Sequence, residues 1–177
     1  MTSDLSNKGL SSFSSISFSE NIKILNLSRN VFKLIPQNIP ISHLEQLDLS
    51  GNSLSTYAFS RTFLSNFWNE LITHTHTHTH RLSFPAPIPT LNILNLSGNR
   101  LYDLNLTLDE IRTKCKNVTN LSLNGNPWQR RVKKGTPSSK RRMTMTNGEV
   151  RRHVLTKLGE LRTLDGIDTT SELYRIN

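Results

Sequence analysis

The stretch Leu44-Glu-Gln-Leu47-Asp-Leu49-Ser-Gly-Asn52-Ser-Leu54 decides the fold of this chain, because the same spacing of apolar residues and one asparagine occurs four times. The other copies begin at Ile22, Leu91 and Val118, and all four match the template LxxLxLxxNxL when Ile, Val, Phe and Trp are accepted in place of Leu. Self-similarity at a period of about 20–50 residues is the signature of a repeat protein, whose coils stack on one another. The sequence therefore predicts a solenoid.

Within each copy the leucines alternate with other residues, which is the pattern of a short β-strand with one buried face. The leucines are expected to stack between coils into a continuous core, since no single repeat can bury its apolar face alone. The asparagine after the strand is expected to turn inward, where its amide can pair with buried backbone groups. We interpret all four asparagines as structural: Asn30, Asn52, Asn99 and Asn126.

The four segments resemble the repeats of leucine-rich-repeat proteins. The resemblance implies an α/β fold, a leucine-rich-repeat solenoid of right-handed coils that each combine a strand with a helix or a 3-10 turn. It also implies that the strands lie parallel on the concave face and that a helical cap covers the C-terminal coil. Such a cap is physically required, because the last coil would otherwise expose its leucines to water.

The segment 150–166, together with Asn126-Pro127, is similar to the C-terminal cap of short intracellular leucine-rich-repeat proteins. These proteins include phosphatase-regulatory subunits, a spliceosomal snRNP subunit, acidic nuclear phosphoproteins and ciliary dynein-associated proteins, which share no common partner. Gly159 stands where the family has proline, Val150 where it has an aromatic residue, and the link before the cap is longer than usual. The matching residues are Arg151, Val154, Leu155, Leu158, Leu161, Leu164, Asp165 and Gly166.

The chain has 177 residues and a net charge of +9, from 22 Lys and Arg against 13 Asp and Glu. Ten basic residues and one acid, Glu149, lie between Arg130 and Lys157, so the remainder of the chain is balanced at twelve of each sign. No apolar run approaches the ~20 residues that span a bilayer, and no secretory signal is visible. Cys115 is the single cysteine, which excludes an intramolecular disulfide. We therefore expect an intracellular protein of the cytoplasm or nucleus with no membrane partner.

The repeats and their flanks predict five segments. Residues 1–20 contain eight serines and no complete repeat, and we expect either a frayed cap or a disordered segment. The middle two copies start 47 residues apart, so residues 59–83 hold either a degenerate repeat or an insertion. The remaining segments are repeats at 21–128 with a low-complexity His/Thr insertion at 73–83, a basic flexible insertion at 129–149, the C-terminal cap at 150–168 and a tail at 169–177.

Two further patterns predict helices. Thr107 and Glu110 have the spacing of a capping box, which predicts a helix that begins at Thr107. Cys115 follows Ile111 by four residues and is expected to be a buried structural thiol. The second helix is predicted on the convex side from a stripe of apolar residues at every fourth position, which we expect to pack inward, with an exposed partner-binding stripe as the alternative. The stripe consists of Phe59, Phe63, Phe67 and Leu71.

The stretch from Thr73 to His80 is a strict Thr-His alternation. On an extended strand its imidazoles would share one face, and neutral imidazoles are good Zn²⁺ ligands. We interpret the stretch instead as a low-complexity insertion, since metal sites rarely need such regular periodicity and only Glu70 lies nearby to orient the imidazoles. The prediction is therefore no metal and no cofactor, and the alternative zinc ligands are His74, His76, His78 and His80.

The exposed strand positions of the repeats form the predicted concave face, where proteins of this family bind their partners. It lacks paired carboxylates, histidines and thiols, and Asp48 is its one side chain that ionises near neutral pH. Acid–base and nucleophilic chemistry have no candidates there, so we predict a protein that is not an enzyme and has no small-molecule substrate. Its small polar side chains and isoleucines suit a protein partner of unknown identity. The predicted partner-binding residues are Ile24, Asn26, Gln46, Asp48, Ile93, Asn95, Asn120 and Ser122.

The insertion at 129–149 contains two basic clusters, with Gly135, Pro137 and serines between them. This arrangement resembles a bipartite nuclear-import signal, which would bind an import receptor. Nucleic acid is an alternative partner, although no aromatic side chain lies between the clusters to stack on bases, and a merely solvated loop is a further alternative. The residues of the basic loop are Arg130, Arg131, Lys133, Lys134, Lys140, Arg141 and Arg142.

These features lead to three functional predictions. The first is a non-enzymatic intracellular scaffold that binds a protein through its concave face. The second is a ribonucleoprotein component that uses residues 129–157 for RNA or nuclear import. The third, a phosphatase-regulatory subunit, rests on the family resemblance alone.

Overall fold

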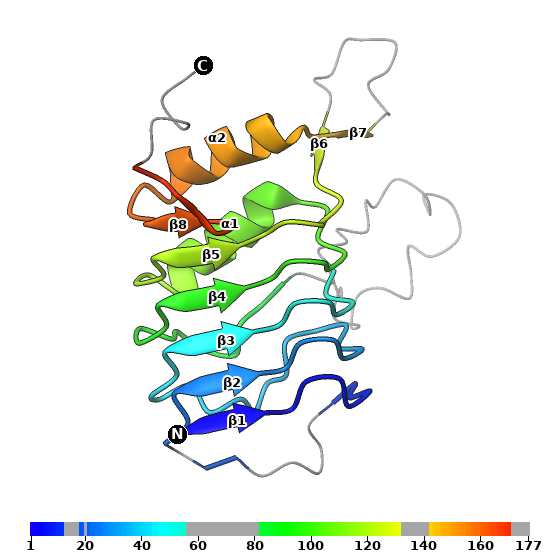
Figure 1. The fold of residues 1–177 in the computed structure, drawn as a ribbon. Coiled ribbons are helices and arrows are strands. Elements are labelled where there is room, and N and C mark those ends of the chain that lie inside the picture. The colour runs from blue at the N-terminus through cyan, green and yellow to red at the C-terminus, as the bar shows by residue number, and fades with distance from the viewer. Residues whose placement is uncertain (13–17, 20, 56–81, 132–141, 171–177) are drawn as a thin grey trace, which may run out of the picture.

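The computed structural model describes residues 1–177 apart from 13–17, 20, 56–81, 132–141 and 171–177. Its main feature is a seven-stranded sheet in the order β1-β2-β3-β4-β5-β8-β9, in which neighbouring strands are parallel except for β8 and β9 (Figure 1). The predicted apolar helix and the histidine tract lie outside the described residues. The strands of the sheet are β1 Thr2–Asp4, β2 Ile24–Asn26, β3 Gln46–Asp48, β4 Ile93–Asn95, β5 Asn120–Ser122, β8 Thr163–Leu164 and β9 Ile167–Asp168.

One leucine from each of β2, β3, β4, β5 and β8 aligns across the sheet, and these leucines form part of the core. Strand β3 pairs directly with β4 although their repeats start 47 residues apart, so no further strand of the sheet lies between them. The chain is therefore a leucine-rich-repeat solenoid, as predicted. The aligned leucines, each at most 1% exposed, are Leu25, Leu47, Leu94, Leu121 and Leu164.

The repeated asparagines pair with buried backbone groups, which confirms their structural interpretation. The Asn52 Nδ2 atom donates to the carbonyl oxygens of Leu27 and Leu49, at 3.0 Å each. Its Oδ1 atom accepts from the Phe32 N–H at 3.1 Å. Each asparagine thus ties its own coil to the coil before it. The same pattern of donors and acceptors holds Asn30, Asn99 and Asn126.

The N-terminal segment forms an additional coil at one end of the sheet. Strand β1 pairs with β2 in the register of the template, which puts Ser3 at a leucine position and Lys8 at an asparagine position. The Asn30 Oδ1 atom accepts from the backbone N–H groups of Lys8 and Leu10, both at 3.0 Å. The described part of residues 1–20 is therefore neither frayed nor disordered, which corrects the prediction. The template did not detect this repeat in the sequence, because Ser3 and Lys8 do not match it.

Helix α1 (Leu104–Lys114) begins one turn earlier than predicted. Asp103 is its N-cap, and the Asp103 carboxylate accepts from a backbone N–H of the first turn at 3.1 Å. The predicted capping box is wrong, because Thr107 is fully buried inside the helix. Glu110, which is 7% exposed, accepts instead from the Phe84 N–H at 2.9 Å.

Cys115 is the C-cap of α1 and is buried, as predicted. Burial raises the pKa of its thiol to about 12, and the nearby Glu110 carboxylate is the second cause. The thiol therefore stays protonated at neutral pH, where a nucleophilic cysteine would need to be a thiolate.

The C-terminal cap combines helix α2 (Asn147–Lys157) with the hairpin of β8 and β9. A capping box between Thr146 and Glu149 starts α2 three residues before the predicted boundary at 150. Val154 and Leu161 are buried in the core, so the cap covers the apolar end of the solenoid.

The segment 129–149, predicted to be a flexible insertion, has regular structure at both ends. Strands β6 (Gln129–Arg131) and β7 (Arg142–Thr144) pair antiparallel in a separate two-stranded sheet. The residues between these strands lie outside the described part. The prediction of a flexible segment is therefore wrong for its two ends. The β6–β7 pairing joins residues that are distant in the sequence, and local composition cannot predict such a pairing.

Candidate functional site

The eight predicted partner-binding residues lie in two rows on one side of the sheet, which we call the strand face. Because successive side chains of a strand point to opposite sides, both rows face away from the buried leucines between them. Ile93 is 37% exposed, whereas Ile24 is half-buried. The first row runs through Ile24, Gln46, Ile93 and Asn120, and the second row runs through Asn26, Asp48, Asn95 and Ser122.

The second row is held by hydrogen bonds to its own backbone. In four coils an Oδ1 atom accepts from the N–H two residues later, which is an Asx turn and ends each strand in the same way. The triplets Asn-Leu-Ser and Asp-Leu-Ser, which recur along the sequence, are the signal for these turns. The acceptors, at 2.8 to 3.1 Å, belong to Asp4, Asn26, Asp48 and Asn95.

Asp48 and Asn95 are also joined across the sheet. The Asn95 Nδ2 atom donates to Asp48 Oδ2 at 3.3 Å, and the Ser97 hydroxyl donates to Asn95 Oδ1 at 2.7 Å. Asp4 extends this row on β1, which adds a second carboxylate that the incomplete first repeat hid. The Ser6 backbone N–H, followed by the Ser6 hydroxyl, lowers the pKa of Asp4. The row is therefore acidic and is oriented before any partner binds.

The last repeat ends differently, because Ser122 has no side-chain carbonyl that could form an Asx turn. Asp165, in the turn between β8 and β9, supplies an acceptor from the next coil. Its Oδ1 atom accepts from the N–H groups of Leu123 at 2.7 Å and Asn124 at 2.9 Å. Asp165 has φ of 56°, a left-handed conformation that Asp and Asn adopt more readily than other non-glycine residues. Asp165 thus supplies the hydrogen-bond acceptor that the last repeat would otherwise lack, and this is the structural role of this cap residue.

The predicted basic residues are not brought to the strand face. Arg130 and Arg131 lie in β6 and Arg142 lies in β7, beyond the last repeat, with Arg131 opposite Arg142 in the register. The other residues of the basic loop and the histidines lie outside the described part: Lys133, Lys134, Lys140, Arg141, His74, His76, His78 and His80.

The described residues show no constellation for metal binding. Among them, no group of three or more His, Cys, Asp or Glu side chains lies together in a way that could hold a metal ion. Within the same residues, no helix has the length and apolar character needed to cross a bilayer. On the strand face the charged groups are the separate carboxylates of the second row, and the Lys23–Glu45 ion pair at 2.7 Å borders the first row. These carboxylates and this ion pair are suited to contacts with the surface of a binding partner.

Comparison with protein-family models gives no match, and comparison with curated proteins gives none either. Among solved structures, the chain is similar to one in the crystal structure of the Drosophila melanogaster SNF/U2A' complex, with a TM-score of 0.58 and 18% identity. The similarity covers 97% of this chain and 75% of that chain. At this level of identity it supports the solenoid fold alone.

Proposed function

We propose that this protein is a non-enzymatic scaffold that binds a protein partner through the strand face. The observation that carries the proposal is the register of β2 to β5, which places Ile24 and Ile93 in one row beside a second row of oriented polar groups. Ile24 and Ile93 are two strands apart in the first row, or about 9.5 Å at the usual strand spacing. Polar groups that are already oriented lose little conformational entropy when they bind a partner.

A protein partner is also the class of ligand that the similar solved structure suggests. The similar chain belongs to a structure of a complex, SNF with U2A', so we infer that a protein partner suits the present chain as well. The proposal keeps the cytoplasm or nucleus as the expected location, since a lone cysteine such as Cys115 fits a reducing compartment.

Ile93→Arg tests the proposal directly. The Ile93 side chain is 37% exposed and makes no hydrogen bond, so this variant should fold normally while its charge disrupts an apolar contact. Asp48 and Asn95 are poorer targets, because their substitution would remove oxygen atoms that form the Asx turns. Leu34→Arg is the matched control, because Leu34 is an aliphatic residue that is 52% exposed and lies outside the two rows.

The readout is affinity capture from a cell lysate, followed by mass spectrometry and by titration of each captured partner with the purified variants. A partner that is retained by wild type and Leu34→Arg and lost by Ile93→Arg would support the strand face as the binding surface. Equal capture by all three proteins would overturn the proposal. Circular dichroism of each variant checks that the fold is intact.

A second candidate function, RNA binding in a ribonucleoprotein, is favoured by the pairing of β6 with β7. The pairing joins the ends of the two basic clusters, and α2 continues the charge with Arg151 and Arg152, while Lys157 is paired with Asp109 at 2.8 Å. Neutralising several phosphates would make RNA affinity fall by about 10³-fold or more between 50 and 200 mM salt. Fluorescence anisotropy with a labelled single-stranded RNA tests this, and affinity that is unchanged by salt would exclude it.

An import receptor is the other proposed partner of the basic clusters. Replacing Lys133, Lys134, Lys140 and Arg141 by alanine in a fluorescent fusion, which leaves β6, β7 and the α2 capping box in place, should then shift the protein from the nucleus to the cytoplasm. An unchanged distribution would argue against an import signal in this segment.

A further inference from the structure

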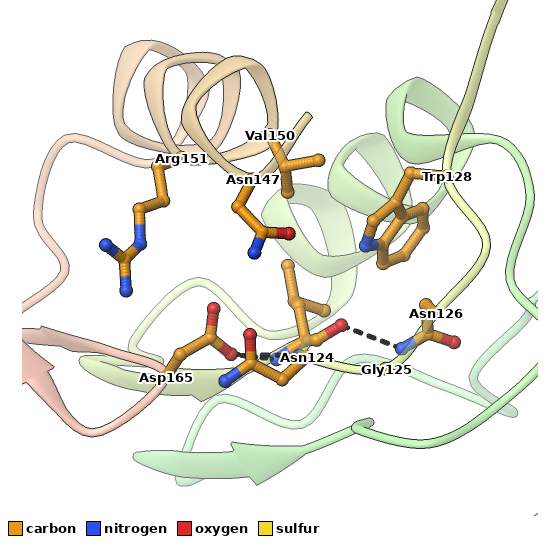
Figure 2. Close-up of a pocket in the computed structure, with 9 residues that line it drawn as sticks. Asn124, Gly125, Asn126, Trp128, Asn147, Val150, Arg151 and Asp165 are labelled. Carbon is orange, nitrogen blue, oxygen red and sulfur yellow. Dashed lines mark hydrogen bonds between the residues drawn. The ribbon is translucent and has the colours of Figure 1, made fainter. Parts of the chain in front are cut away.

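A small pocket lies where the last repeat meets the C-terminal cap, outside the two rows of the strand face. Its volume is about 110 Å³, roughly that of three or four water molecules at ~30 Å³ each. The turn after β5, the start of α2 and the turn between β8 and β9 surround it (Figure 2). The lining residues that matter here are Asn124, Gly125, Asn147, Arg151 and Asp165.

The Gly125 N–H lacks the partner that its equivalents have in the earlier coils. No carbonyl of a further coil follows Gly125, because the chain turns into the β8–β9 hairpin at Asp165. Within the described part of the chain this N–H has no hydrogen-bond partner. Gly125 is exposed, so water reaches this donor in the free protein and a ligand that binds there would replace that water. In the four earlier coils the same position donates to the next coil at 2.7 to 2.9 Å, from Asn7 to Ser28, Arg29 to Ser50, Gly51 to Ser97 and Gly98 to Asn124.

The side chains around Gly125 supply both donors and acceptors. The amide groups of Asn124 and Asn147 make no hydrogen bond to any other described residue, so their donors and acceptors are available to a ligand. Asp165 uses one carboxylate oxygen, Oδ1, for two backbone N–H groups. Figure 2 shows Arg151 reaching from α2 toward Asp165, and Asn147 beside it on the side of Asn124.

The charges of the lining select the chemistry of a ligand. Arg151 and Asp165 cancel, so the pocket is neutral while it contains strong hydrogen-bonding groups of both kinds. A carboxylate would be attracted by Arg151 and repelled by Asp165, and the reverse holds for an ammonium group, so neither ion gains a net attraction that offsets its desolvation. A neutral group that has one carbonyl and one N–H side by side avoids the desolvation cost of an ion.

We propose that this pocket binds a carboxamide group of a partner, either an Asn or Gln side chain or a main-chain peptide group. The carbonyl oxygen accepts from the Gly125 N–H, in the position that a carbonyl of the next coil takes in the earlier repeats. The amide N–H donates toward Asp165, and Asn147 closes the other side. The pocket lies outside the strand face, so its failure would leave the proposed function untouched.

The experiment is a titration of the ¹⁵N-labelled full chain with three small probes, followed in two-dimensional NMR spectra. N-methylacetamide mimics a main-chain peptide group, acetamide mimics an Asn or Gln side chain, and acetate is the charged control. We expect a saturable shift of the Gly125 amide signal with acetamide, N-methylacetamide or both, and a weaker response with acetate. A response to acetamide alone assigns the site to side chains, a response to N-methylacetamide alone assigns it to the main chain, and a response to both shows that the pocket accepts either source.

Asn147→Leu should abolish the shift, because the leucine side chain fills the pocket and removes an amide. Asn147 is exposed and its side chain makes no hydrogen bond to the described residues, so the fold should tolerate the change. Asn92→Leu is the matched control at another exposed asparagine and should respond like wild type. If Asn147→Leu perturbs signals beyond the pocket, Asn147→Ala replaces it, with an expected loss of affinity of about fivefold for one hydrogen bond.

The proposal would be wrong if neither amide probe shifted the Gly125 signal at the highest soluble concentration. It would also be wrong if acetate gave a response as strong as that of the amides. An unchanged response in both Asn147 variants would overturn it as well.

Discussion

Replacing Asp165 by alanine should destabilise the protein by about 3–4 kcal/mol, whereas replacing it by asparagine should cost only about 1 kcal/mol. The prediction follows from the position of this residue at the end of the hydrogen-bond ladder. The Asp165 Oδ1 atom accepts from Leu123 N–H at 2.7 Å and Asn124 N–H at 2.9 Å, and the residue has φ of 56°. Alanine loses both bonds and is strained in this conformation. Asparagine keeps an oxygen acceptor and tolerates the backbone angle.

The magnitude can be worked out from these contacts. A hydrogen bond to a charged acceptor contributes about 1.5–3 kcal/mol when water cannot replace it. Asn124 is exposed, so water can satisfy its N–H in the variant, and about 2–3 kcal/mol remains for the two bonds together. The left-handed conformation adds about 1 kcal/mol for alanine. For asparagine only the charge of the acceptor is lost, which accounts for its smaller effect.

Urea denaturation of the wild type and both variants checks the prediction. With a slope of about 2 kcal/mol per molar urea, the midpoint should fall by about 1.5–2 M for Asp165→Ala and by about 0.5 M for Asp165→Asn. Amide exchange at Leu123 and Asn124 measures the same loss locally, which matters if the cap unfolds before the repeats. Equal midpoint shifts for the two variants, or unchanged exchange at both amides in Asp165→Ala, would refute the reasoning.

Four further predictions concern stability and reactivity. Asn52→Ala should cost about 2–4 kcal/mol in urea denaturation, because it leaves three backbone groups without partners, and Asn126→Ala should cost less, since Asn126 is more exposed. Thr146→Ala should cost about 1 kcal/mol through loss of the α2 capping box, and an effect near zero would contradict the cap. The Cys115 thiol titrates at about 12 when folded against 9.0 as the ordinary value, so stability should fall as pH rises through this interval and thiol reagents should react at pH 8 only after unfolding. Deletion of residues 73–80, which leaves the buried Leu82 and Phe84 in place, should change the melting temperature little, and a large fall would contradict an insertion of low-complexity sequence.

The sheet could be predicted because its information is local and repeated. One buried leucine between two less buried positions specifies which side of a strand faces the core, and repetition fixes the register between strands. The first coil was not predicted from the template, because Ser3 occupies a leucine position and Lys8 occupies an asparagine position. Asn30 of the following repeat nevertheless supplies the bonds that hold this coil. The neighbouring repeat therefore compensates for the incomplete template, which single-segment matching does not detect.

The errors at α1 and at the basic segment have a common physical cause. Thr107 and Glu110 have the spacing of a capping box, but both are buried, and Glu110 finds its partner in the distant N–H of Phe84. Likewise β6 and β7 pair across eleven positions of sequence, from Arg131 to Arg142. Contacts between distant segments decide both cases. The Asx turns are different, since their triplets are visible in the sequence and could have been predicted.

The distribution of charge separates the two proposed binding functions. Asp4 and Asp48 make the second row of the strand face acidic, whereas the positive charge of the chain is concentrated from β6 to α2, beyond the last repeat. A polyanion such as RNA would be repelled by the strand face and attracted to the basic segment, so one ligand of this kind cannot use both surfaces well. High salt should therefore weaken RNA binding while leaving an apolar contact at Ile93 largely intact. If salt released both partners together, the two functions would share a surface, and the assignment of the protein partner to the strand face would be wrong.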